Sequence, residues 1–254
     1  MKLGLVTYNL AKSWDVPTII KNCRETGFSG VELRTTHAHG VEPTLGEAER
    51  AAVKEQFRAG GIEIAGLGTT CEYHSPDPEE VRRNIEATKD WVLLARDLGC
   101  PGVKVRPNGL QVDKGIPREQ TLRQIGEALA ECGAFAADHG VEIRLEVHGR
   151  DTQDPRNLRA ILDVAGPQVY ACWNSNPGEV VNGSIKANFA LLRDRIRLVH
   201  MRNLYEPDYP WRELLQLLKG TGYQGYTLIE SGRETSDPFM VMSYCRALWE
   251  EMLR

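Results

Sequence analysis

The chain has 254 residues and a formal net charge of −4, with 41% hydrophobic and 26% charged residues. This composition is ordinary for a globular protein and excludes a disordered chain, a collagen and a coiled coil. A slightly acidic chain is a poor partner for the phosphate backbone of nucleic acids, and no apolar run reaches the ~20 residues that a membrane-spanning helix needs.

Short β-branched runs alternate with longer helical patterns from one end of the chain to the other. We expect eight strands, at residues 3–7, 30–34, 62–67, 102–106, 142–148, 169–174, 196–200 and 226–230. A helix follows each strand, at residues 15–26, 46–59, 77–98, 117–139, 154–165, 184–192 and 211–219 and from 237 to the C-terminus. Strict alternation favours a parallel sheet, and eight such units favour a closed barrel over an open α/β sheet. The sequence therefore predicts a single (β/α)8 TIM barrel that occupies residues 1–254 as one domain.

The strands carry ionisable and amide groups on the parity that faces into the barrel, because side chains alternate between the two faces of a strand. This inner set consists of Glu32, Arg34, Lys104, Arg106, Arg144, Glu146, His148, Asn174, His200, Arg202 and Glu230. Burial of so many charges is costly unless they are paired or bind a metal. We expect the deeper Lys104 and Arg144 to belong to the scaffold, Lys104 or Arg106 to neutralise Glu146, and Glu32 to neighbour Arg34.

Four of these residues lie at the ends of four consecutive strands, the fifth to the eighth: Glu146, Asn174, His200 and Glu230. Their mixture of oxygen and nitrogen donors suits one divalent ion, Mn²⁺ first, with Mg²⁺, Co²⁺ or Zn²⁺ as alternatives. Such an ion holds sugar oxygens and polarises a carbonyl group. Glu146 and Glu230 are then placed to act as general base and general acid.

At these residues the chain resembles the xylose isomerase-like superfamily of sugar (phosphate) isomerases and epimerases. The resemblance extends over the whole chain and is carried by the segments Thr26–Leu33, Leu145–His148, Cys172–Pro177, Val199–Arg202 and Gly222–Glu230. It implies a TIM barrel that binds one divalent ion through a glutamate, an aspartate, a histidine and a second glutamate. It also implies that the two glutamates, here Glu146 and Glu230, move a proton next to a carbonyl group. Asn174 stands where the family usually has aspartate, so the ion is expected to bind more weakly, or with help from His148.

The resemblance predicts a metal-dependent isomerase or epimerase of a keto-sugar, an inosose or a related polyol. The alternatives are a lyase or hydratase acting on an oxidised sugar, including cleavage of 3-keto-glycosides, and a non-catalytic carbohydrate-binding barrel. The superfamily also contains DNA-repair endonucleases, but the acidic charge argues against them. The turn at residues 8–11 carries no glycine, so no nucleotide cofactor is expected.

Several further side chains are candidates for contact with the sugar: His37, His74, Arg106, His148, Arg202, Trp14 and Trp211. For each, a structural role is the alternative: an exposed loop histidine, an ion pair with Glu146, or an indole that packs on a helix. His39 accompanies His37 in the second loop.

The cellular setting is read from the N-terminus and the cysteines. Residues 1–10 lack the apolar core of a signal peptide, and the six cysteines show no metal-binding spacing. We therefore expect reduced thiols in a cytoplasmic protein with a small-molecule sugar substrate and no nucleic-acid or membrane partner, and we leave a homo-oligomer open as an alternative to a monomer.

Overall fold

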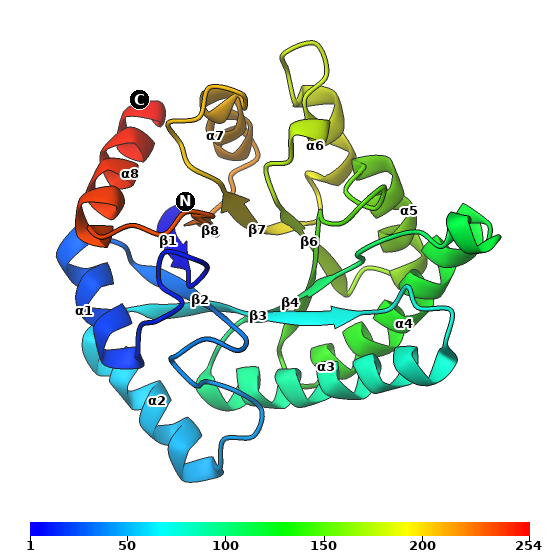
Figure 1. The fold of residues 1–254 in the computed structure, drawn as a ribbon, viewed down its shortest axis with the longest axis horizontal. Coiled ribbons are helices and arrows are strands. Elements are labelled where there is room, and N and C mark those ends of the chain that lie inside the picture. Colours follow the sequence, from blue (N-terminus) through cyan, green and yellow to red (C-terminus); the bar gives the residue numbers. More distant parts are fainter.

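The strands close into a barrel. A computed structural model describes all 254 residues, and its eight parallel strands pair in chain order, with β1 also paired to β8 (Figure 1). The strands are β1 (Lys2–Val6), β2 (Gly30–Arg34), β3 (Glu63–Glu72), β4 (Gly102–Arg106), β5 (Glu142–Glu146), β6 (Val169–Trp173), β7 (Ile196–Met201) and β8 (Tyr226–Ile229). The prediction of a single (β/α)8 TIM barrel is confirmed.

Eight helices surround the barrel (Figure 1). They are α1 (Val16–Thr26), α2 (Glu47–Gly60), α3 (Pro78–Leu98), α4 (Arg118–Asp138), α5 (Pro155–Ala165), α6 (Lys186–Leu192), α7 (Trp211–Gly220) and α8 (Pro238–Met252). None of them is long and apolar enough to cross a membrane. All six cysteines are buried and unpaired.

The same device begins four of the helices. An aspartate side chain accepts a hydrogen bond from a backbone N–H of the first turn, and a proline follows within two positions, at α1, α3, α5 and α8. The aspartate satisfies one of the unpaired N–H groups at a helix start, and proline at this position removes a donor that has no partner there. These caps fix where each loop at the barrel mouth ends.

The apolar residues divide according to strand parity. Val103, Val105, Ile143 and Leu145 belong to a core of 60 buried residues between the strands and the helices. Inner-parity residues such as Cys172 form a separate cluster of six inside the barrel. The predicted alternation is therefore confirmed, and the polar groups of the inner parity lie above an apolar layer.

Two regions differ from the prediction. Strand β3 continues five residues beyond the expected end at 67 and reaches Glu72, which pairs with Arg106 of β4 after a shift of register. Short 3₁₀ helices, Val112–Lys114 and Pro177–Glu179, occupy the loops after β4 and β6. The longer β3 adds the polar side chain of Glu72 to the barrel mouth.

Candidate metal and active site

Three predicted ligands meet at the carboxyl ends of the strands. Glu146 ends β5, His200 lies near the end of β7, and Glu230 follows β8; their ligand atoms all lie within 4.8 Å of one another. The Nδ1 atom of His200 is 3.6 Å from Glu146 Oε1 and 3.6 Å from Glu230 Oε2. His200 and Glu146 are buried, whereas the side chain of Glu230 is 18% exposed. The cluster therefore opens to solvent on the side of Glu230.

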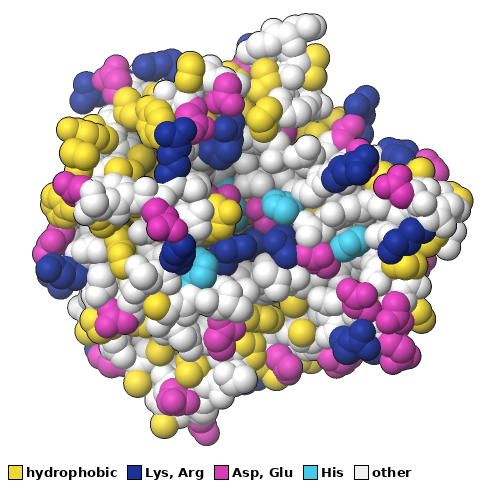
Figure 2. All heavy atoms as spheres, in the orientation of Figure 1, with side chains coloured by type: hydrophobic (Ala, Val, Ile, Leu, Met, Phe, Trp, Pro, Cys, Tyr) yellow, Lys and Arg dark blue, Asp and Glu magenta, His cyan; other side chains and the backbone are white.

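The surface view shows the same region from outside. Histidine, basic and acidic side chains gather around a hollow at the centre of the face drawn in Figure 2. This concentration of polar groups matches the mouth of a TIM barrel, which is where enzymes of this fold carry their active sites.

Glu32 orients the imidazole of His200. Its Oε2 lies 3.2 Å from His200 Nε2, and both side chains are fully buried. A Cβ atom at Gly68 would stand 2.6 Å from Glu32 Oε1, so glycine makes room for this carboxylate. This contact fixes the orientation of the imidazole ring and directs its Nδ1 atom toward the two glutamates.

The expected pairing of Glu32 with Arg34 is therefore wrong. Residues two apart on a strand share a face, but a closed barrel brings β2 and β7 together across its interior. Glu32 reaches His200 by this route, and strand parity alone does not show it.

Lys104 is one of the two cations that were expected to neutralise Glu146, and the structure confirms this pair. Its Nζ donates to Glu146 Oε2 at 2.8 Å, and both side chains are buried. Arg144 pairs with Glu142 at 2.7 Å and donates to the Ala65 carbonyl, as expected of a scaffold residue.

Arg106, the other cation predicted to neutralise Glu146, does not pair with it. It forms an ion pair with Glu72, whose same oxygen also accepts from Asn108. The extension of β3 places Glu72 beside Arg106 in the sheet, which is why the guanidinium turns away from Glu146.

Burial and charge act in opposite directions on the pKa values of the cluster. Burial raises the pKa of both glutamates, but Lys104 and His200 hold the pKa of Glu146 well below its ordinary value, whereas that of Glu230 stays raised. Burial lowers the pKa of Lys104 and His200, but the surrounding acidic groups outweigh it and raise both. The protein alone thus holds a network of compensating charges at this point.

The residues present fit a divalent ion. His200 Nδ1 is a buried nitrogen with no hydrogen-bond partner, and it points between two carboxylate oxygens. Two carboxylates and one imidazole are donors that Mn²⁺, Co²⁺ and Zn²⁺ accept. Glu146, His200 and Glu230 would hold the ion.

Asn174 stays a predicted fourth ligand. It follows the last residue of β6 and is 9% exposed. The neighbouring side chains are committed to backbone groups, because Ser175 donates to the His200 carbonyl and Asn176 to that of Val147. The Asn174 amide forms no such bond and remains available to a ligand.

Substitution of Asn174 by aspartate is expected to tighten the binding of Mn²⁺ by roughly tenfold, because an added ligand charge favours a hard cation. Titration calorimetry on the metal-free protein and the Asn174→Asp variant measures this. Unchanged or weaker affinity in the variant would argue against Asn174 as a ligand.

A buried acid in the loop after β6 had no signal in the sequence. The Tyr209 hydroxyl donates to Glu179 Oε2 at 2.7 Å and itself accepts from Trp173 Nε1 at 2.8 Å. Asn176 donates to the second oxygen of Glu179. Burial raises the pKa of Glu179 to about 7, although these hydrogen bonds oppose the shift.

The raised pKa of Glu179 predicts a pH-dependent stability. Between pH 4.5 and about 7 the folded chain keeps a proton that the unfolded chain has lost, so the free energy of unfolding falls as pH rises through this window. At 1.36 kcal/mol per pKa unit, the loss is roughly 3 kcal/mol. Urea unfolding gives the free energy of unfolding of wild type and of Glu179→Gln at pH 4.5 and at pH 8. From the lower to the higher pH, wild type should lose about 3 kcal/mol relative to the variant. An equal change in the unfolding free energy of both proteins between the two pH values would show that the pKa of Glu179 is not raised.

His148 and His74 lie on one side of the mouth. His148 Nδ1 is 2.6 Å from Asn108 Oδ1, and His74 Nδ1 is 3.8 Å from Glu72. Burial lowers the pKa of His148, which favours its neutral form. Beside them is a cavity of about 210 Å³, lined in part by His74, Asn108 and Gln111. Their contact with a sugar stays a prediction.

His37 and His39 lie in the loop after β2. His37 is partly buried and contacts Thr7 and Arg34. His39 is buried, with one ring nitrogen on the Arg34 carbonyl and the other on the Val41 N–H. Neither joins the candidate metal cluster of Glu146, His200 and Glu230.

Two expected sugar contacts are largely covered. Trp211 is 4% exposed, packs against the tilted ring of Tyr209 with ring centroids 4.5 Å apart, and donates to the Glu206 carbonyl. Trp14 is 9% exposed and belongs to the main core. Trp211 therefore packs at the start of α7, which is the structural role predicted as the alternative to contact with the sugar. Arg202 is held by ion pairs with Glu206 and Asp208.

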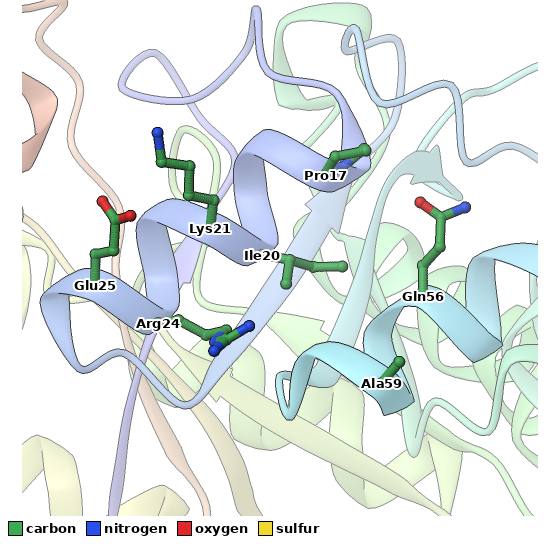
Figure 3. Close-up of a pocket in the computed structure, with 7 residues that line it drawn as sticks. All are labelled: Pro17, Ile20, Lys21, Arg24, Glu25, Gln56 and Ala59. Atoms are coloured by element: carbon green, nitrogen blue, oxygen red, sulfur yellow. The ribbon is translucent and has the colours of Figure 1, made fainter.

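A larger groove lies outside the barrel. It measures about 600 Å³ and runs between α1 and α2, as Figure 3 shows, with Ile20, Lys21, Arg24 and Gln56 among its lining residues. No predicted site residue lines it. The predicted ligands Glu146, His200 and Glu230 lie at the strand ends instead.

The fold and its cluster define a (β/α)8 barrel with two carboxylates and an imidazole at the carboxyl ends of its strands. Residues 20–240 match the family model described as xylose isomerase-like TIM barrel, and the chain belongs to this family. The resemblance seen in the sequence is confirmed. No curated protein sequence matches the chain.

Solved structures of the same fold include several sugar epimerases. D-psicose 3-epimerase from Clostridium cellulolyticum H10, in complex with D-tagatose, is 15% identical, with 100% of each chain covered and a TM-score of 0.84. The 3-keto-D-glucoside 4-epimerase of E. coli is 15% identical, with 99% of each chain covered and a TM-score of 0.81. The IOLI protein with a bound zinc atom is 16% identical, with 99% of this chain and 96% of that chain covered and a TM-score of 0.77. At these identities the likeness establishes the shared fold.

Proposed function

We propose that the protein is a divalent-metal-dependent isomerase or epimerase that acts on a keto-sugar, an inosose or a related polyol. The observation that carries this proposal is the unpartnered Nδ1 of buried His200, which faces one oxygen of Glu146 and one of Glu230 at the barrel mouth. The epimerases among the structures of the same fold support the choice of substrate class.

The ion is expected to be Mn²⁺, held by Glu146, His200 and Glu230 with Asn174 at a fourth position. When bound, such an ion acts as a Lewis acid toward the sugar carbonyl. The zinc atom reported in the IOLI protein supports a divalent ion in this fold, and Zn²⁺ stays an alternative.

The glutamates supply the proton transfer. Lys104 holds Oε2 of Glu146, which leaves Oε1 facing the centre of the cluster. Glu230 comes from β8, three strands away around the barrel, and is the partly exposed member. Two carboxylates on separate strands can flank a sugar, one removing a proton from the carbon beside the carbonyl and the other returning one. Glu32 keeps His200 in place during this exchange.

Solvent exchange tests the proposal. The Mn²⁺-loaded protein is incubated in D₂O with D-fructose, D-tagatose, an inosose and a 3-keto-glucoside, and the carbon next to the carbonyl is followed by NMR. Deuterium at that carbon with an altered configuration is expected for at least one substrate. Interconversion without deuterium would indicate a hydride shift instead. Release of the aglycone would favour the lyase alternative, which begins with the same proton abstraction.

The non-catalytic alternative makes a different prediction for the metal. Elemental analysis and anomalous scattering after Mn²⁺ loading should show one ion per chain among Glu146, His200 and Glu230. A barrel that binds sugar without an ion there would be the carbohydrate-binding module, and the proposed enzyme would be excluded.

A further inference from the structure

Arg34 stands at the barrel mouth above the metal cluster. It is the last residue of β2 and shares the inner parity with Glu32, whose carboxylate meets His200 at 3.2 Å. Two residues along a strand span about 7 Å. Arg34 is therefore about 7 Å nearer the open end of the barrel than Glu32, and its side chain is partly buried.

Arg34 differs from the other arginines of the mouth because it has no acidic partner. Arg106 pairs with Glu72, Arg202 with Glu206 and Asp208, Arg150 with Asp151, and Arg233 with Glu206. No carboxylate lies within 4.0 Å of the Arg34 guanidinium, which forms none of the ion pairs of the chain. A partly desolvated cation without a counter-charge is unfavourable, so its negative partner is expected to come from outside the protein.

Neutral groups hold this guanidinium in place. It lies 4.8 Å from the centre of the Tyr8 ring, and its NH1 atom lies 3.5 Å from Nε2 of His37. The Thr7 hydroxyl accepts the Arg34 backbone N–H at 2.9 Å and contacts Nδ1 of His37. Burial and the nearby guanidinium lower the pKa of His37 to about 4, so His37 is uncharged at neutral pH and accepts rather than repels. Arg34 is thus preorganised without being neutralised.

The arginine and the catalytic cluster share one rim of the mouth. Tyr8, beneath Arg34, comes within 3.9 Å of the position that a Cβ atom would take at Gly232, and Gly232 follows Glu230 by two residues. A single sugar with its reacting carbon at Glu230 can therefore extend past Tyr8 to Arg34.

We propose that Arg34 binds an anionic group, a carboxylate or a phosphate, at the end of the sugar substrate remote from the reacting carbon. This inference rests on the proposed function and narrows its substrate class to acidic ketoses. The planar guanidinium matches both groups, because two of its N–H donors can bond two oxygens of one anion.

The test compares three ketoses that differ only at carbon 6: D-fructose, D-fructuronate and D-fructose 6-phosphate. Their dissociation constants for the Mn²⁺-loaded protein are measured by titration calorimetry. Wild type is expected to bind one of the anionic ketoses about 10- to 100-fold more tightly than D-fructose. The preferred anion separates a uronate site from a phosphate site.

Variants identify the residue responsible. Arg34→Gln should abolish the preference while the affinity for D-fructose stays within about twofold, and Arg34→Lys should retain more of it for the phosphate than for the carboxylate, since lysine acts as a point charge. Arg233→Gln removes an equal charge from the mouth at a paired, exposed arginine and should keep the full preference.

Other results contradict the inference in distinguishable ways. Equal binding of the three ketoses by wild type, or an equal loss for all three in Arg34→Gln, would overturn the anion site and leave the proposed function standing. Failure of every ketose to bind, together with absence of deuterium exchange, would overturn both.

Discussion

Replacement of either Glu146 or Glu230 by glutamine is expected to lower turnover by roughly 10²- to 10⁴-fold, the usual contribution of a general acid or base. Glutamine keeps the shape of the side chain but cannot accept a proton from carbon. The amide oxygen of Glu146→Gln can still accept from Lys104, which donates to this side chain at 2.8 Å. The fold should therefore survive, as circular dichroism and thermal unfolding can verify.

Deuterium exchange distinguishes a chemical role from a structural one. Each single variant, loaded with Mn²⁺, should lose incorporation of solvent deuterium next to the carbonyl. Glu234→Gln is the matched control: Glu234 follows Glu230 by four residues, is exposed and pairs with Lys12. Full exchange in both glutamine variants would exclude this pair as acid and base.

The central site follows from the periodicity of the sequence. Strand parity and chain order together placed Glu146, His200 and Glu230 on the same face at the same end, and a barrel leaves little choice about what such residues meet. This prediction depended on short, strongly β-branched strands, whose inner and outer residues are easily separated.

The partners of these residues follow from contacts across the barrel, which no local pattern contains. Glu32 meets His200 although their positions in the chain are 168 residues apart. The predicted third strand ended at residue 67, so the sequence did not show that Glu72 lies beside Arg106. The ion pair between these two side chains turns the Arg106 guanidinium away from Glu146. The buried Glu179 lies in a loop of Asn, Pro and Gly residues, where a charged residue ordinarily indicates exposure.

Substitution of Lys104 by methionine is the second change with a large expected effect. Lys104 and Glu146 are a buried ion pair 2.8 Å apart. Removal of one partner leaves a buried carboxylate beside Glu32 and Glu230, and such a loss costs roughly 3–5 kcal/mol of unfolding free energy. We expect Lys104→Met to be destabilised by this amount when metal is removed with a chelator, as urea unfolding measures.

The same variant should recover stability when Mn²⁺ is added, and more so than wild type. A site that has lost a positive charge attracts a cation more strongly, and an ion that binds only the folded chain raises the free energy of unfolding by an amount that grows with its affinity. Arg144→Met is the control, because Arg144 is also a buried cation but pairs with Glu142 below the cluster. It should be destabilised without an enhanced response to Mn²⁺. If Mn²⁺ stabilised Lys104→Met and wild type equally, the ion would not sense the charge of Lys104, and its site would lie elsewhere than beside Glu146.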